Sequence, residues 1–92
     1  MSKIAVFGTG MVGDTIGSKL IETGHSVMMG SRTANNEKAK AFVAKHKEKA
    51  SAGTFANAAA FGDIIFNCTA GVGSIEALKL AGEDNIKGKI IV

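Results

Sequence analysis

The sequence predicts an α/β fold in which helices cover both faces of a doubly wound parallel sheet. Short apolar runs alternate with segments of helical periodicity along the chain, and there are twelve glycines but no proline. The alternation favours parallel strands joined by right-handed helical crossovers. The 92 residues, 46% of them apolar and 21% charged, fit one ordinary globular domain.

The apolar runs are expected to form five strands. Lys3–Phe7 contains β-branched residues and ends at Gly8, which is typical of a strand buried on both faces. The other expected strands are Ser26–Gly30, Gly53–Phe55, Ile64–Cys68 and Lys89–Val92. For an open doubly wound sheet we expect the strand order 3-2-1-4-5.

Between these runs the periodicity changes to that of helices. In Met11–Thr23, Val12, Ile16 and Leu20 recur at a spacing of four and predict the inward face, and Gly24 ends the helix. The other expected helices are Ala34–Ala50, capped by Thr33 and with Ala39, Phe42, Val43 and Ala50 inward, Ala56–Phe61, and Ser74–Ala81 with Ile75 and Leu78 inward.

The last apolar run stops where the sequence ends, at Val92. A chain that ends within a strand lacks a capping element there, so we expect residues 1–92 to be the N-terminal part of a longer protein. A complete minimal domain with an edge strand is the alternative. Met1–Gly8 is too short an apolar run for a signal peptide, and no run approaches the roughly 20 residues of a membrane helix. One cysteine fits a reducing compartment, so we expect a cytoplasmic protein with no membrane contact.

The charge pattern favours a small anionic ligand over nucleic acid. The net charge is +3, and the chain has no Trp or Tyr on which bases could stack. We therefore expect no nucleic-acid partner. No His, Cys, Asp and Glu have metal-ligand spacing, so we predict no metal site. Cys68 has apolar neighbours and no histidine placed to activate it, which favours a buried thiol over a nucleophile.

The strongest motif is the G-x-G-x-x-G run between the first strand and the first helix, the context of a dinucleotide-binding turn. In this motif Gly8 allows the tight turn, Gly10 lets a pyrophosphate approach the backbone, and Gly13 lets the helix pack on the sheet. The helix N-terminus supplies N–H donors for the anion. The sequence thus predicts a Rossmann-type domain whose pyrophosphate site is Gly8, Thr9, Gly10, Met11, Val12 and Gly13. A glycine-rich turn without a ligand is the alternative.

The end of the second strand predicts which dinucleotide binds. NAD sites usually place a carboxylate there, on the ribose 2′-hydroxyl. This chain has none between Gly24 and Asn36 and instead has Arg32, which can pair with a 2′-phosphate. We therefore predict NADP as the cofactor, with Ser31, Arg32, Thr33, Asn36 and Lys38 near the 2′-phosphate. A capped, solvated turn is the alternative.

A second small-residue loop, Thr69–Gly73, follows the fourth strand. In an open doubly wound sheet this loop should face the glycine turn, because ligands bind at the switch point between these strands. Thr69, Ala70 and Gly71 are therefore expected beside the cofactor, with a simple turn as the alternative.

The chain also resembles a known family. The runs Lys3–Gly13 and Gly24–Arg32, with their patterns G-T-G-x-x-G and G-H-x-h-h-h-G-S-R (h, apolar), are similar to the NADP-binding domain of the deazaflavin (coenzyme F-420)-dependent NADP oxidoreductases. The resemblance implies pyrophosphate binding at residues 9–12 and 2′-phosphate binding at Ser31 and Arg32. The family commonly has Thr-x-Pro after the fourth strand, where this chain has Cys68-Thr69-Ala70.

The resemblance implies that residues beyond this chain form the deazaflavin site and the contacts of a homodimer. The expected function is therefore NADP(H) binding in an oxidoreductase that exchanges hydride with a second small molecule, deazaflavin-type or other. Hydride transfer depends on positioning more than on acid–base groups, so we name no catalytic residue and expect the 92 residues alone to be inactive. A non-catalytic nucleotide-sensing module is the alternative.

Overall fold

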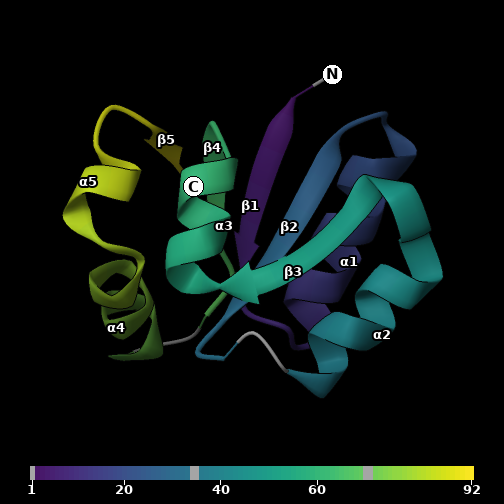
Figure 1. Cartoon of the computed structure of the whole chain (residues 1–92), viewed down its shortest axis with the longest axis horizontal. Helices are drawn as coiled ribbons and strands as arrows, with labels where there is room; N and C mark the ends of the chain where they lie inside the picture. The colour runs from purple at the N-terminus through teal and green to yellow at the C-terminus, as the bar shows by residue number, and fades with distance from the viewer. Residues whose placement is uncertain (1, 34–35, 70–71) are drawn as a thin grey trace.

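A computed structural model describes residues 2–33, 36–69 and 72–92 and shows one five-stranded parallel sheet (Figure 1). Its order is β3-β2-β1-β4-β5, so the predicted fold class and strand order are confirmed. The elements are β1 (Lys3–Phe7), α1 (Met11–Glu22), β2 (Ser26–Ser31), α2 (Glu37–His46), a 3₁₀ helix (Lys47–Lys49), β3 (Ala50–Thr54), α3 (Phe55–Phe61), β4 (Ile64–Asn67), α4 (Val72–Ala81), α5 (Glu83–Ile86) and β5 (Ile90–Ile91). No helix in these described ranges is long and apolar enough to cross a membrane.

The central strand β1 divides the core into two layers because its side chains alternate between the faces of the sheet. Ile4 and Val6 lie in a buried cluster with residues of α1 and α2, whereas Ala5 and Phe7 lie in a second cluster with residues of α3 and α4. All four are 2% exposed or less. The sheet is therefore covered on both faces, as expected for parallel strands made of continuous apolar runs.

Gly13 and Gly17, four residues apart on one row of α1, are the buried residues of this helix, which agrees with a close approach of this row to a strand. Leu20 of the predicted inward row also packs against the cluster that contains Ile4 and Val6. A Cβ at Gly13 would overlap the carbonyl oxygen of Gly8, and one at Gly17 would lie 2.8 Å from Cζ of Phe42. The inward face of α1 thus consists of Gly13, Gly17, Leu20 and Ile21, and Val12 lies outside it. Val12 is 61% exposed, so its predicted inward position is wrong.

The predicted boundary between the second helix and the third strand is also wrong. Lys47 has a φ of 56° and ends α2, after which Ala50 pairs with Val27 as the first residue of β3. Ala50 is thus a buried strand residue and not part of a helix. At the other end of β3, Phe55 begins α3, because the Thr54 hydroxyl accepts the Asn57 N–H in a capping box.

The start of α2 differs from the prediction as well. The side chain of Asn36 accepts the Ala39 N–H at 3.1 Å and caps the helix, in place of the predicted cap Thr33. The predicted first helical residue, Ala34, lies outside the described residues. Helix α5 was not predicted, and Ile75, predicted to face inward, is 59% exposed.

Candidate nucleotide-binding site

The turn between β1 and α1 is held between the carboxyl ends of β2 and β4. Gly8 has a φ of +104°, a conformation that favours glycine, and its N–H donates to the Gly30 carbonyl at 3.0 Å. A Cβ at Gly8 would lie 3.2 Å from the carbonyl oxygen of Cys68 and 3.4 Å from Cγ2 of Thr69. Backbone geometry and packing therefore both account for glycine at this position.

Gly10, the N-cap of α1, differs from its two partners in the motif. Its backbone is extended, with φ −75° and ψ −171°, which any residue can adopt. Among the described residues, nothing lies within 4 Å of where its Cβ would stand. Neither strain nor packing within the described chain requires glycine at this position. The open space adjoins the first N–H groups of α1, which lack intrahelical acceptors by helix geometry.

A cavity of about 430 Å³ opens beside this turn, within the range of roughly 300–1,000 Å³ typical of small-ligand pockets. Its walls come from the start of α1 and from α2: Thr9, Gly10, Met11, Asp14, Thr15, Lys38 and Ala41. The structure thus brings three of the predicted pyrophosphate residues together with Lys38, a predicted phosphate ligand. Of the other three in the motif, Gly8 forms the turn, Val12 is exposed and Gly13 is packed against Gly8.

The remaining predicted phosphate residues each have a role within the protein. The Ser31 hydroxyl is buried and donates to the Thr33 carbonyl at 2.5 Å. The Arg32 guanidinium forms an ion pair with Glu76 of α4, with side chains 66% and 45% exposed. Asn36 uses its carbonyl oxygen to cap α2. To contact a phosphate, the Arg32 guanidinium has to break its ion pair with Glu76 or bind both anions. The Ser31 hydroxyl has to give up its hydrogen bond to the Thr33 carbonyl.

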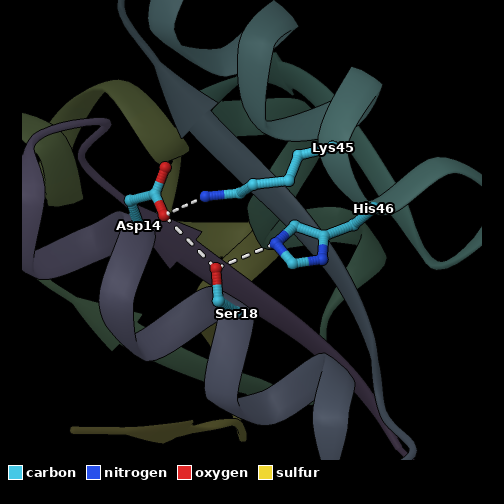
Figure 2. Close-up of polar contacts among 4 residues, drawn as sticks. All are labelled: Asp14, Ser18, Lys45 and His46. Atoms are coloured by element: carbon cyan, nitrogen blue, oxygen red, sulfur yellow. Dashed lines mark hydrogen bonds and ion pairs between the residues drawn. The ribbon is translucent and has the colours of Figure 1, made fainter.

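A polar cluster joins α1 to α2 (Figure 2), and one of its members, Asp14, lines the cavity. Oδ1 of Asp14 accepts hydrogen bonds from Oγ of Ser18 at 3.2 Å and from Nζ of Lys45 at 2.7 Å. Ser18 has a single hydroxyl proton, so its 2.8 Å contact with Nε2 of His46 is one in which the imidazole donates. The hydrogen bond from Lys45 lowers the pKa of the Asp14 carboxyl. Asp14 is therefore an ionised carboxylate on the wall of the cavity, and Lys45 balances its charge.

Neither this cluster nor the Arg32–Glu76 pair is predicted by the sequence. Asp14 and Lys45 are 31 residues apart, and no local pattern connects them. The spacing of Asp14 and Ser18, four residues apart on one helix, is the only local signal, since such residues are neighbours on a helix surface.

The segment after β4 lies beside the glycine turn, as predicted, at Thr69. Its hydroxyl donates to Oδ1 of Asn67 at 2.5 Å, and its methyl group approaches Gly8. The predicted contacts Ala70 and Gly71 lie outside the described residues.

Burial raises the pKa of the half-buried Cys68 thiol, which agrees with a thiol that is not a nucleophile. No three His, Cys, Asp or Glu side chains are grouped to hold a metal within residues 2–33, 36–69 and 72–92. The absence of a metal site stays a prediction.

A parallel sheet of order 3-2-1-4-5 with a glycine turn and an open helix N-terminus at its switch point defines a dinucleotide-binding domain of the Rossmann type. The model of the family described as "NADP oxidoreductase coenzyme F420-dependent" matches residues 3–92, and the chain belongs to this family. The resemblance noted in the sequence is confirmed, and so is NADP as the cofactor. No curated protein matches the chain.

Solved structures agree with this assignment. A protein from Arthrobacter sp. FB24 assigned as an F420-dependent NADP reductase has 36% identity and a TM-score of 0.85, over 99% of this chain and 44% of that one. A reductive aminase from Aspergillus terreus in complex with NADPH has 26% identity and a TM-score of 0.75, over 99% and 30%. An imine reductase from Bacillus cereus, at 24% identity and a TM-score of 0.79 over 99% and 30%, shares the fold. This chain thus spans less than half the length of these proteins.

Proposed function

We propose that this chain is the NADP(H)-binding half of an oxidoreductase that exchanges hydride with a deazaflavin-type second substrate. The observation that carries the proposal is the space at Gly10. Since neither the conformation nor the packing described there calls for glycine, close approach of a ligand to the backbone accounts for it best.

The donor set around this space fits a dinucleotide. The N–H groups at residues 11–13 lie at the positive end of the α1 dipole and would hold the pyrophosphate. Lys38, on the wall of the cavity, adds a cation on one side of the turn. Arg32, on the other side, would take the 2′-phosphate through its guanidinium fork.

The chemistry of such a protein requires orientation from these residues. Bound NADP(H) supplies the transferable hydride at the nicotinamide C4. The glycine turn and the cations Lys38 and Arg32 would fix the position of the nucleotide. Thr69, which follows β4, lies next to this turn. Positioning alone can account for a large part of a hydride-transfer rate.

The second substrate is proposed from the family and from the Arthrobacter protein, both described as F420-dependent. The homodimer, the larger chain to which residues 1–92 would belong and the cytoplasmic location stay predictions.

Calorimetric titration with NADPH and NADH tests the proposal. Charge-assisted hydrogen bonds to the 2′-phosphate contribute roughly 1.5–3 kcal/mol, so NADPH should bind about 10- to 150-fold more tightly. The matched variant Arg32→Ala should lower NADPH affinity toward that of NADH and leave NADH affinity unchanged. Equal affinities in the wild-type chain would refute the NADP site. With the full-length protein, hydride transfer from NADPH to F420 separates an enzyme from a nucleotide sensor, which would bind without turnover.

A further inference from the structure

We propose that Glu76 of α4 is a specificity-determining residue, which weakens the preference for the 2′-phosphate by competing with it for Arg32. The inference rests on the proposed NADP site. It adds a residue that lies outside the two sequence runs, Lys3–Gly13 and Gly24–Arg32, that carry the family resemblance. It predicts that removing one carboxylate from α4 makes the protein discriminate better between NADP and NAD.

The sheet topology explains how these two residues meet. Phe7 of β1 pairs with Gly30 of β2 on one side and with Asn67 of β4 on the other. Arg32 follows the end of β2, and Glu76 lies in the helix that follows β4. Two strand spacings separate β2 from β4, about 10 Å. Figure 1 shows the end of β2 and helix α4 at the same lower edge of the sheet.

The ion pair therefore bridges the carboxyl end of β1, where the glycine turn begins. It draws the Arg32 side chain toward α4, away from the cavity that Lys38 lines between α1 and α2. Carboxylate and phosphate oxygens bind the same N–H groups of a guanidinium. A 2′-phosphate at the end of β2 would thus have to displace Glu76 from Arg32 or share the guanidinium with it. In either arrangement the charge of Glu76 acts against a doubly charged phosphate.

The size of the effect follows from exposure. The two side chains are 66% and 45% exposed, and ion pairs this exposed are weak because water screens them. The pair is weak enough for a phosphate to displace and strong enough to change affinity about two- to fivefold. A purely structural role for Glu76, in which it only tethers α4 to the β2 end, would alter binding of both dinucleotides alike.

The experiment compares NADP⁺ and NAD⁺ binding by calorimetry, because these ligands differ only in the 2′-phosphate. Glu76→Gln, which keeps the shape of the side chain without its charge, should bind NADP⁺ about two- to fivefold more tightly and NAD⁺ as the wild type does. Glu22→Gln is the control for net charge. It removes an exposed acid at the far end of α1, about 18 Å along the helix, and should change neither affinity. In an Arg32→Ala background, Glu76→Gln should have no effect on NADP⁺ binding.

Unchanged or weaker NADP⁺ binding by Glu76→Gln would overturn the inference. So would an equal change for NAD⁺, or an effect that persists without Arg32. Glu76→Ala serves as the second variant, with the same expected direction. If the wild-type chain binds neither dinucleotide, or both equally, the proposed NADP site itself fails, and the competition for Arg32 fails with it. A wild-type preference for NADP⁺ that Glu76→Gln does not raise contradicts the role of Glu76 alone.

Discussion

Replacing Gly10 with alanine tests whether glycine at this position is required for cofactor binding or for folding stability. The backbone at Gly10 has φ −75° and ψ −171°, and its Cβ would meet nothing described within 4 Å. Gly13→Ala is the matched control three residues along the same turn. There the new Cβ would overlap the carbonyl oxygen of Gly8.

Two small terms oppose each other in the stability of Gly10→Ala. Restricting the unfolded chain stabilises the protein by about 0.4–1 kcal/mol. Alanine is a poorer N-cap than glycine by a similar few tenths to about 1 kcal/mol. The free energy of unfolding should therefore stay within about 0.5 kcal/mol of the wild type, or roughly 4 °C in Tm. Gly13→Ala forces backbone apart and should lose about 1–3 kcal/mol.

Binding by Gly10→Ala should fall although its stability does not. A methyl group at Gly10 stands where a phosphate oxygen would approach the helix N-terminus, so NADPH affinity should fall at least about tenfold, equivalent to about 1.4 kcal/mol. Thermal unfolding followed by circular dichroism and calorimetric titration measure the two effects on the same samples. A folded Gly10→Ala protein that binds NADPH like the wild type would show that the cofactor does not use this turn.

Two further predictions concern the contacts of α1. Gly17→Ala places a Cβ 2.8 Å from Cζ of the buried Phe42 and should lower the free energy of unfolding, measured in urea, by about 1–3 kcal/mol. Adding Phe42→Leu should recover part of the lost stability. An unchanged urea midpoint would contradict the close packing of Gly17 and Phe42. Asp14→Asn should remove less than about 1 kcal/mol, because the ion pair with Lys45 is exposed. Lys45 lowers the folded-state pKa of Asp14 below its ordinary 3.8. The stabilisation by the ion pair should therefore be complete well above pH 3.8 and be lost as the pH falls through the lowered pKa. Denaturation curves of the wild type and Asp14→Asn should converge at low pH, and a stability difference that persists there would refute the role of the Asp14–Lys45 pair.

The sequence predicted most of the fold because its signals are local. The strand Lys3–Phe7 matches β1 residue for residue, since a continuous apolar run ended by glycine has few alternatives. The third strand was placed late because Ala50 and Ser51 give no strand signal of their own. They pair with β2 only because Lys47 ends the preceding helix in a positive-φ conformation.

The candidate site was predictable in type but not in arrangement. The glycine turn and the basic residue after β2 can be predicted from the sequence, since each role depends on a residue type at a fixed distance from a strand. The exposure of Val12 could not be predicted in this way, because it depends on which face of α1 is turned to the sheet. The partner of Arg32 was hidden for a similar reason. Glu76 lies 44 residues further along the chain. The two meet only because the chain returns from β3, at one edge of the sheet, to β4 on the other side of β1.

The partners of the two cations decide how much selectivity the site can have. Within the described residues Lys38 forms no salt bridge, whereas Arg32 is already paired with Glu76. A phosphate that binds Lys38 therefore gains a new partner, but one that binds Arg32 exchanges one anion for another. The net gain at Arg32 is the strength of the phosphate contact less that of the carboxylate contact, so preference for NADP should lie toward the lower end of what a charge-assisted hydrogen bond provides. The presence of an arginine after β2 therefore predicts which dinucleotide binds, and its partner on α4 determines by how much.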